Sequence, residues 1–341
     1  MTGCCGRLGA AASTELLKSF RAVRGFDCQE CPAALKLMPG FEFVRGRLED
    51  ANAIHDAVRG VNVVVHLAAC PGDADWETAL LPSNIVGTVS LLRAIETVNI
   101  DVAEKAATEA HAAAADNGGR AASSKRARRG MVNTPKHPVH RLIVASSGKL
   151  YAGHKASLPI TVSTTMSPMC AYAATKAFIE AATEAFAADT TAGCLSIVLR
   201  CGWCPRTAAD VGEMRAASGV VGCGADEFLS PRDAASAIRV ACTTPLSSTG
   251  VNGETQRYVA LFVQSRAPPG RHQRFDTSLT QQLLLGAPRP TASCRHHPRD
   301  ASTPREHETR ACGTSVTPPH ARAWALGLYR PRSHSPTSPP P

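Results

Sequence analysis

The chain has 341 residues, 44% of them apolar, and a formal net charge of +9. The positive charge is concentrated in two stretches: residues 105–140 carry seven Lys or Arg against two acidic residues, and residues 289–341 carry eight against three. Because the remainder is close to neutral, the body of the protein has no excess charge for nucleic-acid backbones. Thirteen scattered cysteines with no secretory signal before them indicate reduced thiols in the cytosol or an organelle matrix, and we expect a cytoplasmic location. No apolar run approaches the roughly 20 residues that cross a membrane.

Short β-rich apolar runs alternate with helical patterns, which is typical of a parallel sheet with crossover helices. Strands are predicted at residues 22–27, 41–48, 61–69, 140–147, 195–200 and 257–265. Helices are predicted at residues 12–20, 52–60, 84–98, 171–187, 228–242 (after a short loop) and 275–286. This order predicts an α/β fold of the Rossmann type: a doubly wound parallel sheet, with a small C-terminal substrate-binding portion at about 200–288.

Two segments do not fit this alternation. Residues 101–138 are rich in Ala and then polar and basic, which predicts a low-complexity surface insertion, part of it helical. Its KRARRG run is interpreted as a solvated charge run rather than a nuclear signal. From residue 289 onward Pro, Ser, His and Arg dominate, so we expect a disordered tail at 289–341 behind a single domain at 1–288.

The glycine-rich opening TGCCGRLG stands directly after Met1. In a dinucleotide-binding fold such a loop follows a central strand that is buried on both faces. Losing about four buried aliphatic side chains of that strand would cost ~6–12 kcal/mol. We therefore expect that the first strand of the fold is missing from this chain and is encoded upstream of Met1 in a longer gene.

Gly3, Gly6 and Gly9 form a G-x-x-G-x-x-G pattern at the start of a helix, where bare backbone N–H groups and the helix dipole can hold a pyrophosphate. Asp27 ends the following predicted strand, where its carboxylate can accept hydrogen bonds from the adenosine ribose. A carboxylate at that place repels a 2′-phosphate. The predicted cofactor is therefore NAD rather than NADP.

Tyr172 and Lys176 stand four residues apart on a predicted helix, so their side chains share one face. A phenol, with a reference pKa of about 10, becomes a usable base when a nearby cation favours the phenolate. Ser147 ends a predicted strand, where its hydroxyl can hold a substrate oxygen. The three residues suit removal of a proton from a secondary alcohol while a hydride leaves for a nicotinamide.

With the segments GFD, VVVHLAA, NIVGT, VASSGKLYAG and YAATK, these motifs resemble the extended short-chain dehydrogenases/reductases of the NAD-dependent epimerase/dehydratase group, over residues 2–288 without the insertion. The resemblance implies that Ser147, Tyr172 and Lys176 are the catalytic triad. It implies a cofactor site formed by Gly3, Gly6, Arg7, Leu8, Gly9, Asp27, Leu48, Ala68, Ala69, Asn84, Tyr172 and Lys176. Arg47 departs from the family, which usually has an acidic residue there to meet the adenine amino group.

The segment between Arg200 and the tail is short for a nucleotide-sugar domain, which favours a smaller substrate. LRCGWCPRT and FLSPRDAA resemble the uronate dehydrogenases, which oxidise a sugar acid at its anomeric carbon. The resemblance implies a sugar or sugar-acid substrate held by Ser147, with Arg206 or Arg215 as candidate ligands of its carboxylate. The alternative for the two arginines is that they are ordinary surface residues. The alternatives for the function are a nucleotide-sugar epimerase or dehydratase and a non-catalytic dinucleotide-binding protein.

Two C-x-x-C pairs, CQEC and CGWC, offer thiol redox or zinc chemistry as a further alternative. CGWC runs into Pro205 without a following helix, unlike a thioredoxin-type site, and the two pairs lie on different parts of the predicted sheet. No metal site is therefore predicted. We expect a small-molecule substrate and no nucleic-acid or membrane partner, and the pairing of many relatives through the Tyr-Lys helix implies a homodimer.

Overall fold

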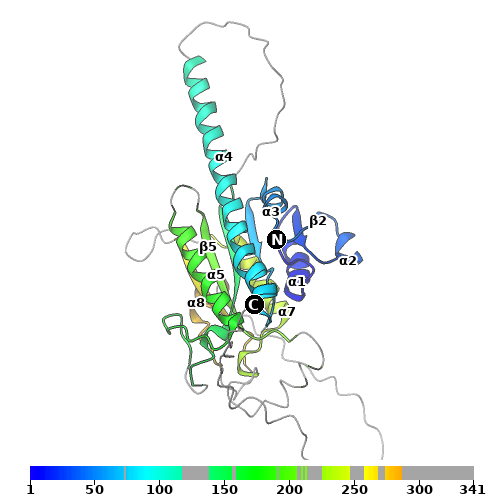
Figure 1. Cartoon of the computed structure of the whole chain (residues 1–341), viewed down its shortest axis with the longest axis vertical. Helices are drawn as coiled ribbons and strands as arrows, with labels where there is room; N and C mark the ends of the chain where they lie inside the picture. The colour runs from blue at the N-terminus through cyan, green and yellow to red at the C-terminus, as the bar shows by residue number, and fades with distance from the viewer. Residues whose placement is uncertain are drawn as a thin grey trace, which may run out of the picture. The chain divides into compact units, whose positions relative to one another are not determined.

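The computed structural model describes residues 1–72, 74–116, 138–155, 159–189, 191, 193–205, 209, 212, 225–245, 257–267 and 273–285 (Figure 1). The chain divides into two compact units, Met1–Ser293 and Cys294–Pro341, and every described residue lies in the first. The predicted tail, and residues 117–137 of the predicted insertion, lie outside the described residues.

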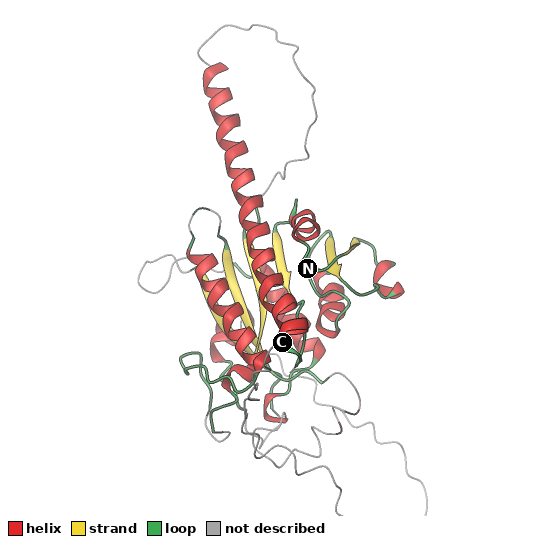
Figure 2. Cartoon of the chain, viewed as in Figure 1, coloured by secondary structure: helices red, strands yellow, loops and turns green. Residues whose placement is uncertain are grey.

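Parallel strands form the sheet in the middle of the domain (Figure 2). Those in the described part of the chain are β1 (Val23–Asp27), β2 (Phe41–Arg45), β3 (Val63–His66), β4 (Arg141–Ser147), β5 (Leu195–Cys201) and β6 (Tyr258–Val263). β1 pairs with β2, and β3, β4, β5 and β6 lie side by side in that order. Each predicted strand is confirmed to within a few residues of its expected bounds.

Helices cover both faces of this sheet. They are α1 (Arg7–Leu16), α2 (Ala33–Lys36), α3 (Ala51–Val58), η1 (Trp76–Val86), α4 (Gly87–Asp116), η2 (Gly148–Tyr151), α5 (Ala171–Ala188), η3 (Ala225–Glu227), α7 (Pro231–Thr243), α8 (Ser278–Thr280) and η4 (Gln281–Leu285). One hydrophobic cluster joins α1 and α7 to one face, and a second joins α3, α4 and α5 to the other. This three-layer arrangement confirms the predicted doubly wound α/β fold.

Side-chain alternation along β4 shows how both faces are filled. Leu142 and Val144 belong to the cluster beneath α4 and α5, whereas Ile143 between them belongs to the cluster beneath α1 and α7. All three are almost completely buried. A parallel strand covered on both faces must be apolar at every position, which is why the run LIVA reads as continuous rather than alternating.

Met1–Gly3 take the position between β1 and β3. Thr2 forms one parallel bridge to Phe26 on β1 and another to His66 on β3. Its N–H donates to the Val65 carbonyl oxygen at 2.9 Å. The β1–β2 pair is therefore joined to the other four strands through the bridges of Thr2. Thr2 lies where the first strand of a Rossmann-type fold runs.

The helix α4 continues past its expected end. The predicted helix stops at residue 98, but α4 extends to Asp116, so the first part of the predicted insertion is a regular continuation of a core helix. Its run of Ala, Glu and Lys has high helix propensity and needs no burial to stay helical. By length and composition alone the helix Trp76–Ala112 could cross a membrane, and 44% of its most apolar stretch is buried within the protein.

Candidate active site

The glycine loop forms a narrow turn at the carboxyl ends of β1 and β3. Gly3 has a φ of +73°, and a Cβ there would stand 2.6 Å from the Ala68 backbone nitrogen. A Cβ at Gly9 would stand 1.9 Å from the Gly3 carbonyl oxygen, whereas one at Gly6 would stand 3.3 Å from it. Gly6 is the N-cap of α1 and makes no side-chain cap. Bare backbone at a helix N-terminus is the arrangement that holds a pyrophosphate.

Arg7 and Leu8 follow the loop on the first turn of α1. The Arg7 Nη1 is buried and has no hydrogen-bond partner among the described residues. A buried guanidinium N–H without a partner favours an anion at the loop, since leaving it unpaired costs free energy. Leu8 is half-buried and packs against the hydrophobic cluster that it shares with α7.

Asp27 lies at the end of β1 with its carboxylate already engaged. Its Oδ2 accepts a hydrogen bond from the Cys5 backbone N–H at 2.8 Å, and its Oδ1 accepts one from the Gln29 N–H at 3.0 Å. Each oxygen keeps a further lone pair for a ribose hydroxyl. Arg47, which replaces the acidic residue usual in the family, has an exposed side chain that pairs with Glu49 at 3.2 Å.

Three further predicted cofactor residues are Ala68 and Ala69, which follow β3, and Leu48, which follows β2. Ala68 donates its backbone N–H to the Thr2 Oγ1 at 3.3 Å, and Ala69 follows it half-buried. Leu48 is 7% exposed and packs on Gly87, where a Cβ would stand 2.6 Å from the Leu48 Cβ. Ala68 therefore lies against Gly3 of the glycine loop, whereas Leu48 lies against the start of α4, and their contact with a cofactor stays a prediction.

Asn84 joins the end of the β3 loop to the helix that carries the Tyr-Lys motif. Its Oδ1 accepts from the Cys70 N–H at 2.7 Å, and its Nδ2 donates to the Thr175 Oγ1 at 2.9 Å. The side chain is fully buried. Asn84 thus positions the residue next to Lys176 rather than projecting into open space.

Tyr172 and Lys176 lie on the first two turns of α5. The Lys176 Nζ stands 5.7 Å from the centroid of the Tyr172 ring and donates to the Ala145 carbonyl oxygen of β4 at 2.9 Å. Burial lowers the pKa of Lys176 to about 8, because the charged form loses its hydration. Ser147 is the last residue of β4, half-buried, and its Oγ accepts from the Lys149 N–H at 3.2 Å.

Lys149 is a site cation that the sequence analysis did not single out. It is exposed, and its Nζ stands 5.9 Å from the centroid of the Tyr172 ring. The loop that carries Ser147 therefore brings a positive charge to the face of the predicted base. Both predicted carboxylate ligands, Arg206 and Arg215, lie outside the described residues.

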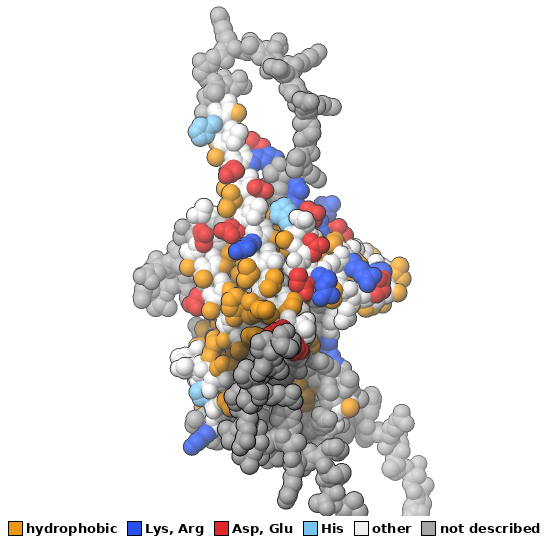
Figure 3. All heavy atoms as spheres, in the orientation of Figure 1, with side chains coloured by type: hydrophobic (Ala, Val, Ile, Leu, Met, Phe, Trp, Pro, Cys, Tyr) orange, Lys and Arg blue, Asp and Glu red, His pale blue; other side chains and the backbone are white. Residues whose placement is uncertain are grey.

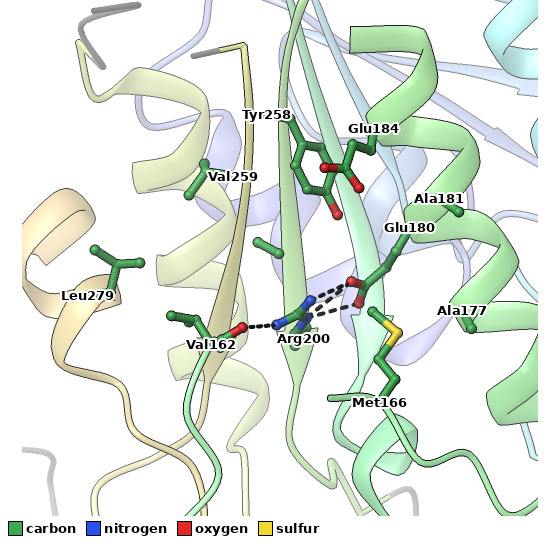
Figure 4. Close-up of a pocket in the computed structure, with 11 residues that line it drawn as sticks. Val162, Met166, Ala177, Glu180, Ala181, Glu184, Arg200, Tyr258, Val259 and Leu279 are labelled. Atoms are coloured by element: carbon green, nitrogen blue, oxygen red, sulfur yellow. Dashed lines mark hydrogen bonds and ion pairs between the residues drawn. The ribbon is translucent and has the colours of Figure 1, made fainter. Parts of the chain in front are cut away.

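A buried ion pair behind the site was also missed. Glu180 accepts hydrogen bonds from the Arg200 Nε and Nη2 at 2.8 to 3.1 Å and from the Ser146 Oγ at 2.5 Å. Figure 4 shows the pair at the wall of a cavity of about 400 Å³ between α5, β6 and α8. The signal in the sequence was a carboxylate four residues after Lys176, on a helix face that is otherwise buried.

Comparison with known proteins agrees with this geometry. Residues 1–202 match the NAD dependent epimerase/dehydratase family. The chain belongs to this family. The predicted family and its NAD cofactor are thereby confirmed, and the glycine cradle together with the unpartnered Arg7 nitrogen fits a dinucleotide pyrophosphate. A search of curated proteins finds no match.

Solved structures share the fold at low identity. A mutated uronate dehydrogenase superposes with a TM-score of 0.58 and 19% identity, covering 85% of this chain and 80% of its own. A glucuronic acid dehydrogenase from Chromohalobacter salexigens gives 0.56 and 18%, covering 83% and 80%. A UDP-glucuronic acid 4-epimerase from Bacillus cereus in complex with NAD gives 0.55 and 19%, covering 86% and 93%. At this low sequence identity, the likeness shows that this chain shares the fold of these three proteins.

Proposed function

We propose that the protein is an NAD-dependent oxidoreductase that takes a hydride from a secondary alcohol or hemiacetal carbon of a sugar acid of the uronate type. One observation carries this proposal: the centroid of the Tyr172 ring lies 5.7 Å from the Lys176 Nζ, which is hydrogen-bonded to Ala145 of β4, and 5.9 Å from the Lys149 Nζ, two residues after Ser147 at the end of β4. Structures with this fold are solved as uronate and glucuronic acid dehydrogenases, which supports the choice of substrate class.

In the proposed mechanism Tyr172 is the general base. Its phenol oxygen takes the proton of the substrate hydroxyl, and Ser147 holds that oxygen in place by a hydrogen bond. Lys176 favours the phenolate by its charge and holds the nicotinamide ribose. A bound NAD would supply the acceptor for the hydride of the carbon that carries this hydroxyl. Arg206, Arg215 or Lys149 would hold the substrate carboxylate, since each offers a cation and Arg can grip a carboxylate with two N–H groups.

A nucleotide-sugar epimerase is the second candidate. The alignment with the solved UDP-glucuronic acid 4-epimerase covers 93% of that enzyme's chain. The two candidates share the abstraction of a hydroxyl proton and of a hydride but differ in what happens next. A dehydrogenase releases NADH, whereas an epimerase returns the hydride and shows no net reduction of NAD.

A screen for NAD reduction tests the proposal. The purified chain is incubated with NAD and with glucuronate, galacturonate, neutral sugars and UDP-glucuronate, and absorbance of NADH is followed. We expect NADH with the free uronates and none with the neutral sugars. Conversion of UDP-glucuronate without net NADH would replace the dehydrogenase by the epimerase, and NAD binding without turnover of any compound would favour a non-catalytic binding protein.

The predicted homodimer is also part of this proposal. Apolar side chains gather over α4 and α5 on the face shown in Figure 3. Leu81 and Val86 on η1 and Phe178 on α5 are exposed apolar residues, at 39%, 43% and 38%. We propose that two copies bury this face together. Sedimentation of the full chain should give a dimer, and Phe178→Glu should give a monomer, because a charge there would be buried without a partner.

A further inference from the structure

The glycine loop carries two adjacent cysteines whose side chains meet a carboxylate. The Cys4 and Cys5 sulfurs lie 3.7 Å apart. One Asp27 oxygen and the two sulfurs all lie within 4.8 Å of one another. Asp27 is held there by its hydrogen bond from the Cys5 backbone N–H, at 2.8 Å. Pyrophosphate binding at this loop needs only backbone N–H groups, so neither thiol is explained by the nucleotide site.

The fold orients the two thiols differently. Cys4 is fully buried against β1, where the bare Gly25 makes room for it: a Cβ at Gly25 would stand 2.8 Å from the Cys4 sulfur. Cys5 is half-buried, and its thiol donates weakly to the Gln29 carbonyl oxygen at 3.8 Å. One sulfur is thus anchored in the core, while the other lies at the surface where a ligand can enter.

Cys31, the second cysteine of the CQEC run, lies outside this group. It is 4% exposed, and its sulfur donates weakly to the Pro32 carbonyl oxygen at 3.7 Å.

We propose that Cys4, Cys5 and Asp27 form a binding site for a thiophilic divalent cation such as Zn²⁺, with water as the fourth ligand. Two thiolates on one tetrahedral zinc, with Zn–S bonds of about 2.3 Å, stand about 3.8 Å apart, which matches the separation of the Cys4 and Cys5 sulfurs. A disulfide would need them about 2.05 Å apart, and the adjacent residues are not so placed. On binding, each thiol releases its proton to solvent and its sulfur lone pair bonds the cation.

Occupation of this site excludes NAD, a consequence that rests on the proposed nucleotide site. Asp27 is the predicted ligand of the adenosine ribose, and a cation on its carboxylate removes that acceptor. The Cys5 N–H, which now bonds Asp27, lies in the same turn that would hold the pyrophosphate. The cation and the dinucleotide therefore compete for one loop, which makes NAD binding sensitive to the free concentration of a thiophilic metal.

Titration with Co²⁺ tests the metal site without any need for activity. The full chain, reduced and freed of metal, should show thiolate-to-cobalt absorption that saturates at one equivalent and disappears on adding Zn²⁺. Cys5→Ser should weaken this site by at least about tenfold, since a hydroxyl is a poor ligand for these ions. Cys204→Ser is the matched control, because Cys204 is also half-buried but follows β5, and it should keep the absorption.

Three outcomes would overturn the site. They are no thiolate absorption in the unaltered chain, equal absorption in Cys5→Ser, and loss of absorption in Cys204→Ser. Circular dichroism of each variant confirms that it is folded. Asp27→Asn is the second variant, which removes the carboxylate charge and should also weaken Co²⁺ binding.

Competition is measured separately by calorimetric titration of NAD. One equivalent of Zn²⁺ should raise the Kd of NAD by about tenfold or more in the unaltered chain and leave it unchanged in Cys5→Ser. An unchanged Kd with Zn²⁺ bound would overturn the competition while leaving the metal site. Absence of NAD binding even without metal would instead refute the proposed nucleotide site, so the two failures are distinguishable.

Discussion

Glu180 on α5 and Arg200 on β5 form a two-pronged ion pair, with Nη2 to Oε2 at 2.8 Å, and side chains that are only 2% and 8% exposed. The same carboxylate accepts from Ser146, next to the predicted catalytic Ser147. The ion pair therefore ties β5 to the helix that carries Tyr172, and the hydrogen bond from Ser146 ties the strand that ends in Ser147 to the same carboxylate.

Removal of one partner of this pair should be costly. Glu180→Gln leaves the Arg200 guanidinium buried without a counter-charge, and we expect a loss of about 3–5 kcal/mol in the free energy of unfolding. Urea denaturation followed by circular dichroism measures it. The double variant Glu180→Met with Arg200→Met should recover much of this loss, because no unpaired charge remains; a double variant as unstable as the single one would contradict the argument.

The Tyr-Lys pair should be required for turnover but not for folding. Tyr172→Phe removes the proton acceptor, and Lys176→Met removes the charge that favours the phenolate. A general base contributes about 10²–10⁴-fold to rate, so each variant should lose at least that factor in kcat. Stopped assays with glucuronate and NAD provide the measurement. Activity of Tyr172→Phe within a few-fold of the unaltered chain would remove Tyr172 from the mechanism.

Activity should fall on the alkaline side of neutrality. Burial lowers the pKa of Lys176 to about 8, so the ammonium is charged below that pH and loses its proton as the pH rises through it. The kcat/KM for NAD should therefore have a descending limb near pH 8. Lys176→Arg keeps its charge over this range and should abolish that limb, even if its rate is lower.

The buried His66 should make the fold sensitive to acid. Its ring bonds the Thr2 and Thr88 hydroxyls, and burial lowers its pKa to about 3. The unfolded chain binds the proton at about pH 6.5, so stability is complete above that pH and falls by about 1.4 kcal/mol per unit as the pH drops toward 3. Chemical denaturation at a series of pH values measures the slope. His66→Gln, which cannot titrate there, should show a shallower one.

Alanine substitutions at Gly9 and Gly6 should show whether the loop needs its glycines for lack of space or for backbone flexibility. Gly9→Ala places a Cβ 1.9 Å from the Gly3 carbonyl oxygen and must displace the loop, whereas Gly6→Ala meets the same oxygen at 3.3 Å. We expect NAD affinity to fall by about tenfold or more in Gly9→Ala and by much less in Gly6→Ala. Equal losses in the two variants would show that the crowding at Gly9 does not govern the site.

Local patterns were sufficient for the elements and for the main chemistry. Continuous apolar runs marked the strands, and the four-residue spacing of Tyr172 and Lys176 placed both on one helical face, because that periodicity is a property of the backbone alone. The glycines at the start of α1 indicated a phosphate-binding loop, because they leave backbone N–H groups bare at a helix N-terminus. The sequence misjudged the end of α4, where Ala-rich propensity continued the helix without any apolar pattern to signal it.

Relations between distant segments were decided only by the tertiary structure. Nothing near Glu180 in the sequence indicates that Arg200 is its partner, and nothing near Cys5 indicates that its backbone N–H donates to Asp27. Thr2 bridges two strands because the sheet leaves it between β1 and β3. Buried charges and thiols take whichever partners the packing of the sheet brings within reach, since burial removes water as the alternative, and that packing is a property of the whole chain.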